Sequence, residues 1–195
     1  MLLNLNSIQE GDTDLLEAYD FTRSLNGIYH GVAPYDQVIN RSASGLIFEA
    51  NGDYISFPAP LAFNGSTIEI DVAAMDLSYD TYKDFVTTSH SRYGLRFESA
   101  NGGGMWKLRR NNADAESLGI TAGDYFANST VKIIIDVDGY WHIYRNDVLV
   151  FESTIAVPVT RVAPAIIIGN INQSIDYTII GTVITGMRFY KNRSN

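Results

Sequence analysis

The stretch VKIIIDVDGYWHIYRNDVLVFES, residues 131–153, decides the fold. Residues 131–137 are β-branched almost throughout, which favours an extended backbone over a helix. Asp138-Gly139 predicts a two-residue type I′ turn, because Gly takes positive φ freely and Asp tolerates it. Residues 140–144 then return as a second strand, Asn146-Asp147 predicts another turn, and residues 148–151 make a third strand.

A two-residue loop fixes the register of this hairpin. It places Ile135 opposite His142 and Ile134 opposite Ile143. Both faces of the ribbon then carry large apolar groups, so both must be covered. The stretch is therefore interpreted as the central meander of a layered β protein.

Strand and turn signals recur at regular intervals from Gly45 onward, which is typical of an all-β, two-sheet antiparallel jelly-roll sandwich. The polar segment 111–128 is interpreted as a long surface connection. The predicted strands are residues 45–50, 53–57, 66–74, 84–88, 93–98, 105–110, 131–137, 140–145, 148–152, 164–169, 176–180 and 183–190.

Composition agrees with one globular domain. Of the 195 residues, 46% are hydrophobic and 18% charged, which is enough apolar surface for a core. The net charge of −8 argues against nucleic acid or an anionic membrane as a partner. The chain has no cysteine, which excludes disulfides and cysteine-based chemistry. No stretch reaches the length of a membrane span, so we expect no membrane insertion.

The meander resembles the laminin-G-like branch of the concanavalin A-like lectin/glucanase superfamily. Residues 45–55, 66–72 and 184–190 resemble further strands of that family in the same order. The likeness extends from about Ala18 to Asn192, so we expect residues 1–17 to form an N-terminal arm and 18–195 the sandwich. The superfamily contains binding modules, structural domains and enzymes, so the resemblance implies the fold more than the function.

Glucan-cleaving members of the superfamily carry Glu-x-Asp-x-Glu, or a bulged Glu-x-Asp-x-x-Glu, on one strand, where alternation places the carboxylates on one face. Glu69 and Asp71 match the first two positions, but Ala73 or Ala74 stands at the third, and neither can transfer a proton. We therefore predict that the chain is not an enzyme. The plainer interpretation is a strand with Ile68 and Ile70 in the core and both carboxylates on the solvent face.

A ligand site is predicted on the condition that the charged residues of three strands share the concave face of the sandwich. Relatives bind sugars in such a trough or at its rim. The alternative is a solvated or subunit-covered face, with Trp106 and Leu108 inward and cross-strand ion pairs outward. The candidate ligand-binding residues are Glu69, Asp71, Arg96, Glu98, Lys107 and Arg109.

Some relatives hold a structural calcium ion in their loops, bound by Asp and Asn oxygens. The candidate ligands here are Asp136 and Asp138, followed by Asn170, Asn172 and Asp176. Acidic residues at such positions also act simply as turn formers. No other cofactor is predicted.

These observations predict a non-enzymatic recognition or assembly module. The fold that the chain resembles usually faces the outside of the cell, whereas Met1 begins a segment without an export signal. We therefore expect a virion-exposed phage structural protein (tail fibre, baseplate or capsid decoration), made in the host cytoplasm, that binds host glycans or other virion subunits. The alternatives are a free carbohydrate-binding lectin, extracellular or at a cell surface, and, ranked last, a glycoside hydrolase. The leucine-rich arm, residues 1–17, is predicted to drive self-association or docking.

Overall fold

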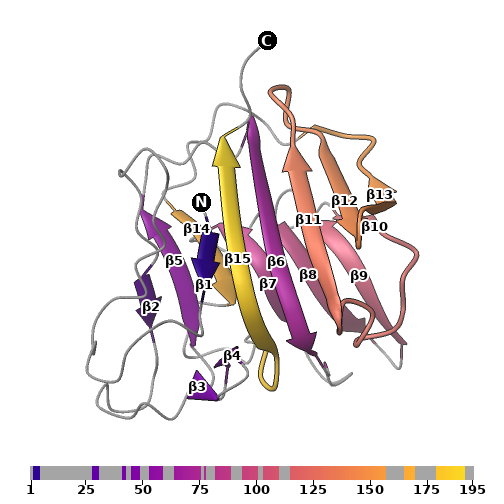
Figure 1. Ribbon diagram of the computed structural model, residues 1–195. Coiled ribbons are helices and arrows are strands. Elements are labelled where there is room, and N and C mark those ends of the chain that lie inside the picture. Colours follow the sequence, from indigo (N-terminus) through magenta and orange to yellow (C-terminus); the bar gives the residue numbers. More distant parts are fainter. Residues whose placement is uncertain are drawn as a thin grey trace.

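A computed structural model describes residues 2–4, 28–30, 41–42, 45–48, 53–58, 64–75, 77, 82–88, 94–100, 103–109, 115–156, 165–169 and 179–191. Two antiparallel sheets of eight and seven strands face each other across an apolar core (Figure 1). The predicted jelly-roll sandwich is therefore confirmed. Among the described residues there is no helix, and so none long and apolar enough to cross a membrane.

The first sheet, called sheet A here, has the strand order β13-β12-β11-β6-β15-β4-β3, with β1 also paired to β15. Its strands are β1 Leu2–Asn4, β3 Arg41–Ser42, β4 Gly45–Ile47, β6 Ser66–Ala74, β11 Ser129–Ile135, β12 Trp141–Arg145, β13 Val148–Glu152 and β15 Val183–Lys191.

The second sheet, called sheet B, has the order β10-β9-β8-β7-β14-β5-β2. Its strands are β2 Ile28–His30, β5 Tyr54–Pro58, β7 Lys83–Thr88, β8 Gly94–Ala100, β9 Gly103–Arg109, β10 Ala115–Ser117 and β14 Ala165–Gly169. In Figure 1 this sheet lies behind sheet A.

Alternation along β6 shows how each sheet separates its two faces. Ile68, Ile70 and Val72 are at most 2% exposed, whereas Glu69 and Asp71 between them are half-buried. Successive side chains of a strand point to opposite faces, so the isoleucines enter the core and the carboxylates lie on the outer face of sheet A. The plainer interpretation of the Glu-x-Asp strand is confirmed in this respect.

The core of sheet B is built around Trp106. Trp106 and Leu108 are fully buried, as alternation predicted. The ring of Phe126 lies 4.8 Å from that of Trp106, centroid to centroid, with an edge-to-face tilt of 78°. Phe126 belongs to the segment that we expected to be a polar surface connection. That expectation is wrong for Leu118 and Phe126, which are both buried in the core.

The turn between β11 and β12 differs from the predicted one by a residue. The Asp136 amide donates to the Tyr140 carbonyl at 3.0 Å, so the loop holds three residues, 137–139. Gly139 has φ 93°, which glycine adopts without strain. Ile134 therefore pairs with His142 and Ile133 with Ile143. The predicted register is wrong, and the correct one places Trp141 and Ile143 in the core.

The type I′ geometry occurs at the next turn instead. Asn146 and Asp147 have φ 49° and 62°, and Arg145 pairs with Val148 across them. Positive φ at both central residues matches the right-handed twist of the flanking strands. The turn predicted at Asn146-Asp147 is thus confirmed.

The N-terminal segment contributes to sheet A through β1. Leu2 pairs with Arg188 and Asn4 with Gly186, in the antiparallel sense. Most of the predicted strand 176–180 lies outside the described residues.

Candidate functional site

The structure separates the candidate ligand-binding residues into two groups. Glu69 and Asp71 lie on β6 of sheet A, whereas Arg96, Lys107 and Arg109 lie on β8 and β9 of sheet B. The side chains between them in sequence fill the core, so the two groups occupy the opposite outer faces of the sandwich. The single trough that would unite them is therefore not formed.

The charged side chains of the sheet B group are largely paired with one another and with other residues of sheet B. Arg96 donates from Nε to Asp84 Oδ1, and the two side chains are 6% and 2% exposed. Glu98 on β8 forms ion pairs with two residues of β9, Lys107 at 2.8 Å and Arg109 at 2.9 Å. The predicted cross-strand ion pairs are therefore confirmed. Burial alone would raise the pKa of Glu98, but these two cations outweigh it and lower the pKa.

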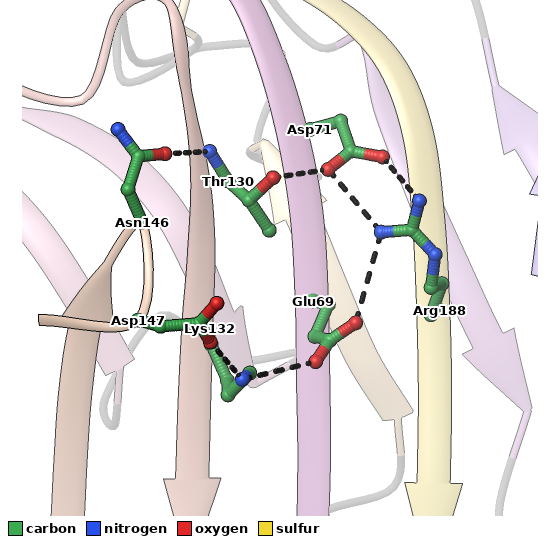
Figure 2. A network of polar contacts seen from close by, with 7 residues as sticks. All are labelled: Glu69, Asp71, Thr130, Lys132, Asn146, Asp147 and Arg188. Atoms are coloured by element: carbon green, nitrogen blue, oxygen red, sulfur yellow. Dashed lines mark hydrogen bonds and ion pairs between the residues drawn. The ribbon is translucent and has the colours of Figure 1, made fainter.

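The sheet A group is joined by residues from three other segments (Figure 2). Backbone register places Lys132, Glu69 and Arg188 in one row across β11, β6 and β15, and Thr130, Asp71 and Gly186 in the next row. Side chains opposite each other on neighbouring strands are close enough to interact. We call this set the sheet A network: Glu69, Asp71, Thr130, Lys132, Asn146, Asp147 and Arg188.

Asp71 is the most heavily bonded member. Its Oδ1 accepts from the Thr130 hydroxyl at 2.6 Å and from Arg188 Nη1 at 3.2 Å. Its Oδ2 lies 2.8 Å from Arg188 Nη2, which completes a two-pronged arginine–carboxylate pair. Both carboxylate oxygens are thus occupied by donors, and the side chain is held in one orientation (Figure 2).

The turn after β12 supports the same network. The Asn146 side chain accepts from the Thr130 amide at 2.9 Å, and the Asn146 amide donates to the Thr130 carbonyl at 2.9 Å. Asp147 accepts a hydrogen bond from the Lys132 ammonium group. That hydrogen bond, assisted by Glu69, raises the pKa of Lys132 against the opposing effect of burial. The type I′ turn therefore fixes one end of the network.

The candidate calcium ligands Asp136 and Asp138 lie at the hairpin turn between β11 and β12, where Asp136 forms hydrogen bonds within the turn. Asp136 Oδ1 accepts from the amides of Asp138 and Tyr140, both at 2.9 Å, and its Oδ2 lies 3.8 Å from His142 Nε2. Asp138 is exposed. Within the described ranges, no group of three or more His, Cys, Asp or Glu residues could hold a metal ion. Asn170, Asn172 and Asp176 lie outside them.

Sequence reasoning missed five of the seven network residues. Thr130 and Lys132 are polar residues in strand β11, and Arg188 is a charged residue in the largely apolar strand β15. A polar residue at an outward position of such a strand is the signal that could have identified them. Their partners are distant in sequence, so this signal predicts the face of the sheet that each residue occupies but not the residues that it contacts.

Comparison with known proteins gives likenesses of fold. No family model matches the chain, and no curated protein does. A sialidase mutant of Trypanosoma rangeli with trans-sialidase activity aligns with TM-score 0.67 and 16% identity, over 100% of this chain and 31% of that one. The same sialidase in complex with sialic acid aligns with TM-score 0.65 and 14% identity, over 100% and 31%.

A second group of likenesses includes the receptor binding domain of botulinum neurotoxin D. It aligns with TM-score 0.54 and 17% identity, over 89% of this chain and 46% of that one. The chain thus spans less than half of each of these structures. At such low identity the likenesses concern the fold alone, and they are compatible with the concanavalin A-like jelly roll.

Proposed function

We propose that this chain is a non-enzymatic recognition module that binds carbohydrate on the outer face of sheet A. The observation that carries the proposal is the sheet A network, in which the paired side chains of Glu69, Asp71 and Arg188 are 17%, 24% and 28% exposed. Sugars are recognised by planar hydrogen-bonding groups placed in this manner beside an aromatic ring. Tyr144 supplies the ring, because it lies opposite Lys132 on the same face.

The same network supports a module without catalytic activity. A retaining glycosidase needs one carboxylate as nucleophile and a second carboxyl group as proton donor. Asp71 has both oxygens occupied by Thr130 and Arg188, and the third position of the Glu-x-Asp pattern is Ala73 on the outer face. A general acid is thus missing from the place where the glucan-cleaving pattern requires it.

The fold likenesses add a weaker form of support. One neighbour is the receptor binding domain of a neurotoxin, and another is a sialidase solved in complex with sialic acid, of which the chain matches 31%. The laminin-G-like branch, a virion-exposed phage protein and association through residues 1–17 remain proposals from the sequence. The runner-up is a free lectin of a polysaccharide system. Virion genes beside the coding gene would favour a phage structural protein, and polysaccharide-utilisation genes would favour a free lectin.

A glycan array tests the proposal with a matched pair of aromatic variants. Wild-type protein should retain a defined set of glycans, and Tyr144→Ala should lose them. Tyr140→Ala should keep them, because Tyr140 is a 37% exposed tyrosine in the hairpin turn, outside the network. Circular dichroism confirms that both variants fold. Binding to no glycan would contradict the proposal, and release of reducing sugar from a β-glucan would contradict the non-enzymatic assignment.

A further inference from the structure

Glu69 differs from Asp71 in how its oxygens are used. Its Oε1 lies 3.5 Å from Lys132 Nζ and its Oε2 lies 3.7 Å from Arg188 Nη1. Both distances exceed the roughly 2.7–3.2 Å of a normal hydrogen bond. The Glu69 side chain is 17% exposed. It therefore stands at ion-pair distance from two cations while its lone pairs remain available to a stronger donor, such as a hydroxyl group.

The cations of the network are already matched by carboxylates. Arg188 contacts Asp71 and Glu69, and Lys132 contacts Glu69 and Asp147. Three carboxylates against two cations leave the sheet A network with one excess negative charge. The whole chain carries a net charge of −8. An anionic ligand would have to displace an internal carboxylate and approach against the field of the protein.

We infer that this site takes an uncharged sugar, whose hydroxyl groups donate to Glu69, and rejects sialic acid and other anionic sugars. The inference rests on the proposed function and narrows its ligand class. A carboxylate that accepts from a sugar hydroxyl forms a charge-assisted hydrogen bond, which is stronger than a neutral one. Lys132 on β11 lies next to Glu69, and Tyr144 on β12 lies beyond Lys132 in the same row.

Two variants with the same chemical change separate this role from a general loss of charge. Glu69→Gln keeps the shape of the side chain but removes the charged acceptor. Glu152→Gln makes the same change on the same sheet, at a 62% exposed side chain that contacts His142. The probes are an array of uncharged cello-, malto-, manno- and galacto-oligosaccharides, with lactose and 3′-sialyllactose as a matched neutral and anionic pair. Titration calorimetry then measures affinity for the uncharged glycans that bind.

The expected result is retention of uncharged glycans by wild type, a weakening of about tenfold or more in Glu69→Gln, and no change in Glu152→Gln. Preference for 3′-sialyllactose over lactose, lost in Tyr144→Ala, would overturn the inference but leave the proposed function standing. Unchanged affinity of folded Glu69→Gln would also overturn it. Binding to no probe at all would overturn both.

Discussion

Gly186 lies directly across the sheet from Asp71, and a β carbon on Gly186 would stand 2.5 Å from Asp71 Oδ2. The ladder between β15 and β6 shifts register just before this pair, because Thr185 is an extra residue between Ile184 and Gly186. Because Gly186 has no side chain, the Asp71 carboxylate has room to lie over β15. Asp71 therefore reaches Arg188 through a space that only glycine leaves open.

Gly186→Ala is expected to destabilise the fold by roughly 1–3 kcal/mol, because the new methyl group must displace a bonded carboxylate. The measurement is the free energy of unfolding in urea. The double variant with Asp71→Ala is the control. Removing the carboxylate removes the clash, so Gly186→Ala should cost much less in that background. Equal costs in both backgrounds would mean that the two residues are not coupled.

Thr130→Val should destabilise the protein by about 1.5–3 kcal/mol, since it removes a hydroxyl that donates to a charged group. Thr185→Val is the matched variant. The Thr185 hydroxyl donates to the Asp71 backbone carbonyl at 3.3 Å, a longer bond to a neutral acceptor, so the loss should be smaller. The two unfolding curves give the comparison, and a larger loss in Thr185→Val would reverse the assignment.

Gly139→Val tests the corrected turn between β11 and β12. A β-branched residue at φ 93° is strained and should cost about 1–3 kcal/mol. Val137→Thr is a control in the same loop, at a side chain that is 61% exposed, and should change little. Thermal unfolding of both proteins checks this. A Gly139→Val protein as stable as wild type would contradict the positive φ at this position.

The sequence predicted the longer strands well because their signals are local, whereas the short strands β2, β3 and β10 were missed. Alternation in β6, β9 and β11 follows from side chains pointing to opposite faces, and it correctly assigned Ile70 and Trp106 to the core. The hairpin register failed because a turn of two residues and a turn of three share the same Asp-Gly signal. Phe126 was missed because a single pair of aromatic residues, Tyr125-Phe126, in a polar segment has no period to reveal it.

The candidate site was predicted only in part, for a different reason. Alternation correctly placed Glu69 and Arg96 on outer faces, but it does not say to which sheet a strand belongs. That depends on strand order, which joins β6 to β11 and β15 across more than fifty residues of sequence. Arg188, the cation that binds both carboxylates, could be assigned to them only once the order was known.

Acid should weaken the protein partly through Glu98. Its folded-state pKa lies below the ordinary 4.5, so its pairing with Lys107 and Arg109 contributes stability above that pH. The contribution is lost as the pH falls through the lower folded-state value. Glu98→Gln should therefore cost about 1–3 kcal/mol at pH 7 and less at pH 3. Urea unfolding at both values checks this, and a cost that does not change with pH would contradict it.

The central claim is that ligand binds on the outer face of sheet A, and amide chemical-shift mapping tests it most directly. Labelled wild-type protein is titrated with the uncharged glycan that binds best on the array. The largest shifts should fall at Glu69, Lys132 and Tyr144, on three neighbouring strands of sheet A. Largest shifts at Arg96, Lys107 and Arg109 would place the site on sheet B instead and contradict the claim.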